Sequence, residues 1–256
     1  MFKDTWDAVS NAAVGKLKFL KENPIGFFIS SILAGFFIGL GVLLSFTIGG
    51  LFTDIPIRKT MMGATFGIAL SLIIICGAEL FTGNNFIMST ALMDKKSKLG
   101  NTIKLWIICL LGNWVGSILI AFMFHFSGLH TGATAEIFAS ASLAKMSGSF
   151  SSLFIRAIFC NILVCLAVWS SFRAKNEVAK LIMIWWCLFA FIISGFEHSI
   201  ANMTILTIGL LNPTNLALTL GGYFWNIIIL IIGNMVGGIL FVAFPYFIIT
   251  REKKEL

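Results

Sequence analysis

Long apolar runs alternate with short charged segments along this chain, and each run approaches the ~20 residues that a helix needs to cross a bilayer. Pro24 follows the polar segment Lys21-Glu22-Asn23 and favours a helix start at the first run. The pattern predicts six membrane crossings, of which the second and fifth are interrupted by polar residues. They cover about residues 24–48, 60–93, 105–124, 152–171, 181–211 and 223–249.

Two further segments have weaker patterns. Residues 2–21 place apolar side chains at steps of three and four, which predicts an amphipathic helix lying on the membrane surface within residues 1–22. Residues 125–152 are rich in Ala, Ser, Gly and Thr, and we expect a connection there that serves as a lid, a binding loop or slack.

The interruption in the fifth crossing is Gly195-Phe196-Glu197-His198-Ser199-Ile200-Ala201-Asn202. Glu197 and His198 are preceded by 16 uncharged residues and followed by 52, so these ionisable side chains are costly and need a reason. The second crossing contains Gly77-Ala78-Glu79-Leu80-Phe81-Thr82-Gly83-Asn84, with the same Gly-x-Glu-x-x-x-x-Asn spacing 118 residues earlier. The chain therefore has two copies of one motif.

A second pair of matched segments indicates that the motifs belong to a longer repeat. Residues 112–118 in the third crossing resemble residues 233–239 in the sixth, at an offset of 121. Each half has three crossings, an odd number, so the second half must enter the bilayer upside down. We expect one domain over residues 1–256, with repeats at 23–125 and 150–250, and the matched glycines allow close helix packing.

Composition agrees with a membrane protein and excludes a nucleic-acid binder. The chain is 58% hydrophobic and 11% charged, against roughly 25% charged residues in a soluble domain. Fourteen of its 18 basic residues fall on the side of the predicted termini, so the net charge of +7 indicates topology, with both termini cytoplasmic. All five cysteines lie in apolar runs, which favours reduced core thiols over a metal site.

Broken helices at membrane depth require a cavity or protein cover, so the motifs predict a cavity or pore near the midplane. Helices restarting near Asn84 and Asn202 would point positive dipole ends at it, which favours an anion. Glu79 and Glu197 occupy equivalent positions, and we expect them to accept hydrogen bonds from the loop backbone. A proton-carrying role is the alternative.

His198 has no counterpart, because Leu80 occupies the matching position. An imidazole titrates near neutral pH, so His198 is a candidate proton-exchanging pore residue, although it could instead hydrogen-bond between helices. Lys145 either draws anions toward the pore mouth or is a solvated loop residue. On composition alone, the expected role of Phe66, Phe81 and Phe191 is packing rather than gating.

The two motifs, GAELFTGN at 77–84 and GFEHSIAN at 195–202, resemble those of the formate/nitrite transporter family, and the resemblance covers essentially the whole chain. It implies an all-α, aquaporin-like subunit with two inverted three-helix repeats, assembled as a homopentamer in the bacterial inner membrane, without cofactor or metal. It also implies pathway roles by position. Leu80, Phe81 and Phe191 would form hydrophobic constrictions, Thr82 would line the first loop, and His198 would be the central histidine beside Asn202; Lys145, Asn161 and Phe66 match more weakly, by spacing and residue type.

The expected function is a channel for small monovalent anions of weak acids. The sequence looks most like the hydrosulfide-conducting members of the family, with a formate or nitrite channel or proton-coupled transporter as the alternative. A bare anion would be desolvated at a dry constriction, so His198, directly or through water, would supply a proton. An aquaporin-type solute channel would need two Asn-Pro-Ala motifs, and the chain has only Asn212-Pro213-Thr214. An enzyme would need a ligand cluster or a nucleophile with its base, which the crossings lack.

Overall fold

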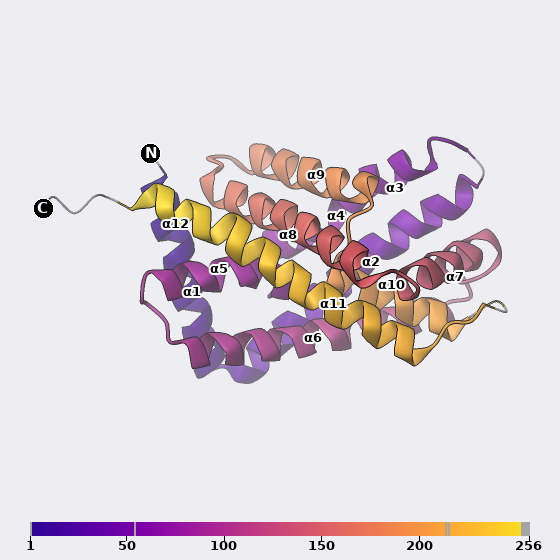
Figure 1. The fold of residues 1–256 in the computed structure, drawn as a ribbon, viewed down its shortest axis with the longest axis horizontal. Helices are drawn as coiled ribbons and strands as arrows, with labels where there is room; N and C mark the ends of the chain where they lie inside the picture. Colours follow the sequence, from indigo (N-terminus) through magenta and orange to yellow (C-terminus); the bar gives the residue numbers. More distant parts are fainter. Residues whose placement is uncertain (1, 54, 213, 215, 252–256) are drawn as a thin grey trace, which may run out of the picture.

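The computed structural model describes residues 2–53, 55–212, 214 and 216–251, so Pro213 of the lone Asn-Pro pair lies outside the described residues. It is a bundle of long helices packed side by side (Figure 1). Within the described residues, six helical segments are long and apolar enough to cross a membrane, which confirms the predicted number of crossings. The elements are α1 (Lys3–Glu22), α2 (Pro24–Leu51), α3 (Arg58–Phe66), α4 (Ile68–Cys76), α5 (Phe81–Met93), α6 (Leu99–Phe126), α7 (Gly132–Met146), α8 (Phe150–Arg173), α9 (Glu177–Ser194), α10 (Ser199–Leu211), α11 (Leu220–Gly238), a π-helical turn (Ile239–Ala243) and α12 (Phe244–Thr250).

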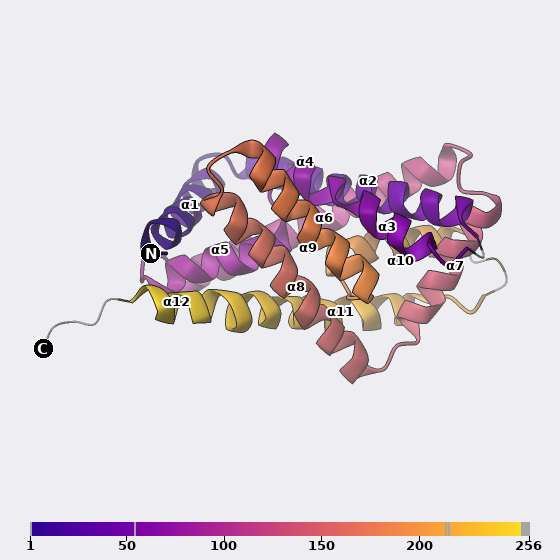
Figure 2. The same ribbon diagram turned by 90° about the horizontal axis from the view of Figure 1, so that it is seen from above.

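The amphipathic segment forms α1, as predicted, and buries its apolar stripe. Trp6 and Val9 are among its buried residues, and the Trp6 indole Nε1 donates to Asp94 Oδ1 at 2.9 Å. At the following junction the Asn23 side chain caps α2 by accepting from the Gly26 backbone N–H at 2.9 Å, with Pro24 in the first turn. Helices α1 and α12 lie at one end of the molecule and α7 at the other (Figures 1 and 2).

Close helix packing in the two halves uses equivalent glycines. Helix α6 packs on α2, and α11 packs on α8. A Cβ atom at Gly116 would collide with the carbonyl oxygen of Ile32, and one at Gly237 would collide with that of Ile158. Both contacts require glycine because backbone meets backbone there. The predicted packing role of the matched glycines is confirmed.

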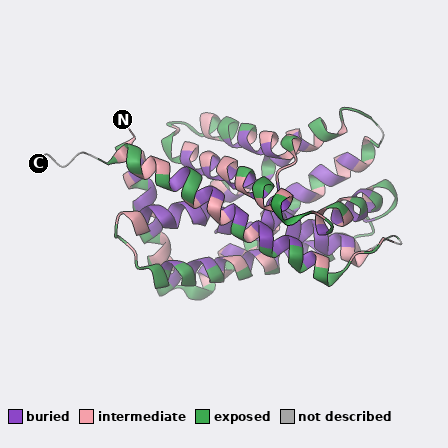
Figure 3. Ribbon diagram, in the orientation of Figure 1, coloured by how far each residue is buried: buried purple, intermediate pink, exposed green. Residues whose placement is uncertain are grey.

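Both motifs interrupt a helix. Helix α4 ends at Cys76, Gly77 follows with φ +81°, and α5 begins at Phe81; α9 ends at Ser194, Gly195 follows with φ +77°, and α10 begins at Ser199. Positive φ is costly for residues with a Cβ, which explains the glycine in each motif. Helices α5 and α10 form the centre of the bundle, where buried residues concentrate (Figure 3).

The connection expected at residues 125–152 is largely a helix. Helix α6 continues to Phe126, α7 spans Gly132–Met146, and α8 begins at Phe150. The Ala-rich composition that suggested slack also favours helix, and the apolar side chains of Ile137 and Phe138 bury α7 against the bundle. Because α7 packs against α2 and α10, it brings Lys145 next to the second motif.

Candidate functional site: two motifs around a central histidine

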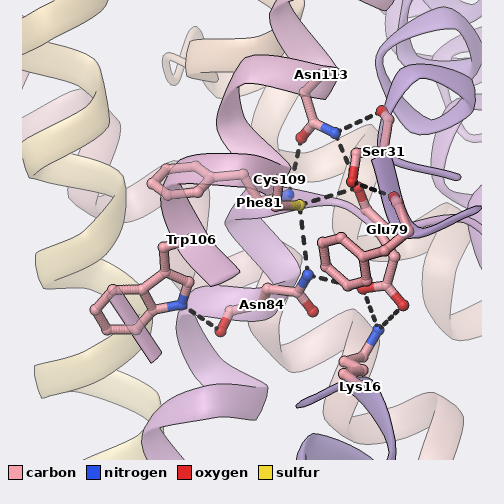
Figure 4. A network of polar contacts seen from close by, with 9 residues as sticks. Lys16, Ser31, Glu79, Phe81, Asn84, Trp106, Cys109 and Asn113 are labelled. Atoms are coloured by element: carbon pink, nitrogen blue, oxygen red, sulfur yellow. Dashed lines mark hydrogen bonds and ion pairs between the residues drawn. The ribbon is translucent and has the colours of Figure 1, made fainter. Parts of the chain in front are cut away.

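The glutamate of the first motif forms an ion pair with a lysine that lies outside the motif (Figure 4). Lys16 of α1 places its Nζ 2.7 Å from Glu79 Oε1 and 2.6 Å from Glu79 Oε2. Asn84 Nδ2 also donates to Glu79 Oε2, at 2.9 Å. Glu79 is 8% exposed, so these side-chain donors offset the cost of burying its charge.

Asn113 of α6 fixes the backbone of the same motif (Figure 4). Its Oδ1 accepts from the Phe81 N–H at 2.8 Å, and its Nδ2 donates to the carbonyls of Ser31 and Glu79, each at 2.8 Å. One amide therefore satisfies a backbone N–H and two carbonyls where the helical hydrogen bonds stop.

The second motif repeats this arrangement with different partners. Lys145 Nζ and Asn202 Nδ2 each donate to Glu197 Oε2 at 2.7 Å. Asn234 Oδ1 accepts from the Ser199 N–H at 2.9 Å, and its Nδ2 donates to the Ala157 and Glu197 carbonyls at 2.8 and 3.1 Å. Each motif thus has a glutamate and an asparagine of its own, and a lysine and a capping asparagine from other helices.

Glu79 and Glu197 have side-chain partners where the sequence predicted backbone donors. Their carboxylates accept from Lys16 with Asn84 and from Lys145 with Asn202. The capping asparagines explain this, since Asn113 and Asn234 accept the first N–H of α5 and α10. The expected free helix N-termini are likewise partly occupied.

His198 caps α10 and contacts the other motif. Its Nδ1 accepts from the Ala201 backbone N–H at 3.1 Å, and its Nε2 lies 3.0 Å from Thr82 Oγ1. A backbone N–H can only donate, so Nδ1 carries the lone pair and the proton of the neutral ring is on Nε2. His198 is 2% exposed and is therefore a buried donor aimed at Thr82.

Three cavities follow one another past His198. The Lys16 cavity, of about 630 Å³, is lined by Lys16, Glu79, Leu80 and Asn84 among others. The Lys145 cavity, of about 120 Å³, is lined by Lys145, Glu197 and Asn202 among others. Between them lies a central chamber of about 10 Å³. Its walls are Ile38, Phe66, Leu70, Leu80, Val164, Leu188, Phe191 and His198.

Shared walls establish the order of these cavities. Leu70 and Leu80 line both the Lys16 cavity and the central chamber. Phe66, Phe191 and His198 line both the central chamber and the Lys145 cavity. His198 is the one polar residue in the wall of the chamber.

The structure brings most of the predicted site residues to these cavities, with three exceptions. Leu80, Phe66, Phe191, His198, Lys145 and Asn202 line a cavity. Phe81 is buried in the hydrophobic core outside the residues lining the three cavities. Thr82 lines none of the three cavities, but its hydroxyl contacts His198, which does. Asn161 lies behind Thr82, since its Nδ2 donates to the carbonyls of Thr82 and Asn234 at 3.3 and 2.6 Å.

Sequence reasoning missed Lys16 and the capping role of Asn113 and Asn234. Lys16 lay in a helix interpreted only as a surface element. The repeat itself carried the signal for Lys16, because two equivalent buried glutamates call for two cations. Asn113 and Asn234 lie in the matched segments 112–118 and 233–239, in which only the glycines were interpreted from the sequence.

Comparison with known proteins agrees with this geometry. The family described as formate/nitrite transporter matches residues 3–248. The nitrite transporter NirC of Salmonella typhimurium is 39% identical over 100% of this chain and 94% of its own length. A solved FNT family ion channel superposes with a TM-score of 0.93 at 38% identity, covering 98% of this chain and 100% of that one. A pentameric formate channel with formate bound superposes with a TM-score of 0.78 at 27% identity, covering 90% of this chain and 98% of that one.

The fold is that of a multi-span membrane transport protein. The chain belongs to the formate/nitrite transporter family, whose members are transporters and channels rather than enzymes.

Proposed function

We propose that this chain conducts small monovalent anions of weak acids through the three cavities, and that they pass the central chamber as neutral acids. The observation that carries the proposal is the narrowness and apolarity of that chamber. It holds about 10 Å³ between two larger cavities, each with a buried Lys–Glu–Asn group. A bare ion there would lose its hydration without replacement, at a cost of several kcal/mol or more.

The anion of a weak acid avoids this cost because it can bind a proton before it enters the chamber. Desolvation disfavours the charged form of an acid and raises its pKa, so an anion moving toward the apolar walls binds a proton more readily. Lys16 and Lys145 are neutralised by Glu79 and Glu197, so their attraction is short-ranged. Their ammonium N–H groups hold an anion that has already entered a cavity.

His198 serves as a hydrogen-bond donor to the passing species. Its Nδ1 is occupied by the Ala201 N–H, so a second ring proton would cost the cap of α10. With the ring in place, the Nε2–H can be shared between Thr82 Oγ1 and a molecule in the chamber without that cost. Proton delivery by His198 itself, as expected from the sequence, requires the cap to break and is the alternative mechanism.

Hydrosulfide is the substrate that we propose among such anions. A volume of about 10 Å³ is close to the minimum that holds one water molecule. Hydrosulfide has one heavy atom and therefore needs less movement of the walls than formate or nitrite, which have three. Nitrite and formate are the alternatives, because they appear in the names of relatives.

The assembly that we propose is a homopentamer with one pathway in each subunit, in the bacterial inner membrane with both termini cytoplasmic. A pentameric formate channel among the structural neighbours supports the stoichiometry. The excess of basic residues near the predicted cytoplasmic ends supports the orientation. Light scattering of the purified protein should give five times 28.1 kDa after subtraction of detergent.

The test is an uptake panel in proteoliposomes, with protein-free liposomes as the baseline because neutral hydrogen sulfide crosses bilayers. Hydrosulfide, nitrite, formate and chloride are compared, and an entrapped dye reports internal pH. Chloride is the matched control, since it is a small monovalent anion but the conjugate base of a strong acid. We expect hydrosulfide fastest, one proton accompanying each weak-acid anion, and chloride at baseline.

The remaining outcomes are decisive. Chloride uptake as fast as hydrosulfide uptake would refute passage as the neutral acid. Formate or nitrite uptake faster than hydrosulfide uptake would overturn the substrate assignment and leave the neutral-acid mechanism in place.

A further inference from the structure

A second large cavity lies away from the transport pathway, between the C-terminal half of α1 and the first turns of α6. Its volume is about 570 Å³. Val14 and Leu17 of α1 and Pro24 at the start of α2 give it an apolar wall, and Val14 is 41% exposed. The cavity is within the size range of small-molecule sites and is open on one side of the bundle.

Lysines surround this apolar wall from two helices. Lys18 and Lys21 come from α1 and Lys104 comes from α6. Glu22 is the one acidic residue of the lining, and it pairs weakly with Lys18 at 3.9 Å. Within the described residues, Lys21 and Lys104 make no ion pair. Among the described residues, the cavity therefore keeps a net positive charge that no ion pair to Lys21 or Lys104 reduces.

The position of the cavity brings it to the membrane surface. Helix α1 is amphipathic, and the membrane-crossing helices α2 and α6 begin at Pro24 and Leu99, next to the cavity. At such a junction the apolar wall meets acyl chains while lysine ammonium groups reach the headgroup level.

We propose that this cavity, the α1–α6 groove, binds an anionic phospholipid. Its apolar wall takes the upper part of an acyl chain, and Lys21 and Lys104 bind the phosphate and any further acidic group of the headgroup from opposite sides. A soluble anion would use only the lysines, and a zwitterionic lipid would not neutralise their charge. The same helix, α1, carries Lys16, so the bound lipid also steadies the lysine that pairs with Glu79.

The test is native mass spectrometry of the full-length protein with equimolar phosphatidylglycerol and phosphatidylcholine of identical acyl chains. We expect the wild type to retain phosphatidylglycerol preferentially. The double variant Lys21→Gln/Lys104→Gln should bind it about 25-fold more weakly, about fivefold for each lysine. The matched control is Lys3→Gln/Lys175→Gln, which removes the same charge from exposed positions outside the groove and should bind as the wild type does.

Three results would overturn the proposal. One is equal retention of the two lipids by the wild type, a comparison that needs no variant to fold. Another is equal weakening in the control variant, which would indicate general attraction by a basic surface. The third is a double variant that loses its oligomeric state while each remaining subunit keeps wild-type lipid affinity. That result would assign the groove to contact with a neighbouring subunit.

Discussion

The motifs at Gly77–Asn84 and Gly195–Asn202 have the same framework although they differ at five of their eight positions. In both, a lysine and the motif asparagine bind the glutamate, and an asparagine from a later helix caps the restarted helix. The two lysines and the two capping asparagines all lie outside the motifs. Symmetric residues thus hold the broken backbone in place.

Two of these differences lie where the motifs meet. Leu80 in the first motif matches His198 in the second, and Thr82 matches Ile200 at the same offset of 118 residues. The first motif therefore has a polar residue, Thr82, where the second is apolar, and the second has His198 where the first is apolar. These two side chains lie 3.0 Å apart. The shared residues form a structural framework, and His198, which the first motif lacks, faces the chamber.

The largest effect should come from the capping asparagines, because each satisfies three buried backbone groups. Asn113→Leu and Asn234→Leu keep the branched skeleton of four side-chain heavy atoms and should each lower the free energy of unfolding by about 4 kcal/mol. Unfolding by SDS titration, followed by tryptophan fluorescence, measures this, with exposed Asn101→Leu as the control. A large loss for one variant and none for the other would break the equivalence of the two halves.

A smaller loss should follow removal of either half-buried lysine that pairs with a motif glutamate. Lys16→Met and Lys145→Met leave a carboxylate buried without its cation, at a cost of about 3 kcal/mol each. The double variants Lys16→Met/Glu79→Gln and Lys145→Met/Glu197→Gln should recover most of it, since no charge remains uncompensated. The same titration tests this, and a single variant as stable as the wild type would mean that its pair is solvated.

The motif glycines should have the smallest effect on stability. Gly77→Ala and Gly195→Ala put a Cβ on backbone with φ +81° and +77°, for about 1–2 kcal/mol each. No atom lies within 4 Å of a Cβ at Gly77, so that cost is backbone strain alone. Gly15→Ala, in the interior of α1 with equally open space, should instead stabilise the protein. If all three variants change stability in the same direction, strain is not the cause.

The fold was largely predictable from the sequence because membrane helices leave a strong pattern. Apolar runs gave the six crossings, and the repeated Gly-x-Glu-x-x-x-x-Asn spacing located both breaks. Helix α7 was missed because its small residues fit both a flexible connection and a helix that packs closely.

The partners within the site were less predictable, since they come from distant helices. Lys16 reaches Glu79 across 63 residues, and Lys145 reaches Glu197 across 52. Phe81 and Leu80 are adjacent in sequence, yet only Leu80 lines the cavities. Neighbouring residues at a helix start point in different directions, and sequence position alone does not say which one faces the cavity.

The proposed passage through the central chamber depends most on His198, and one substitution removes its Nε2–H. Asparagine is a good N-cap, so His198→Asn keeps a cap on α10 while it removes the ring donor. The measurement is hydrosulfide uptake by proteoliposomes with this variant over a range of external pH. We expect uptake at least tenfold slower with the pH profile of the wild type, because a neutral donor is lost and no titrating group is. A changed profile would assign proton delivery to His198, and a rate and profile equal to those of the wild type would contradict a role for His198 in transport.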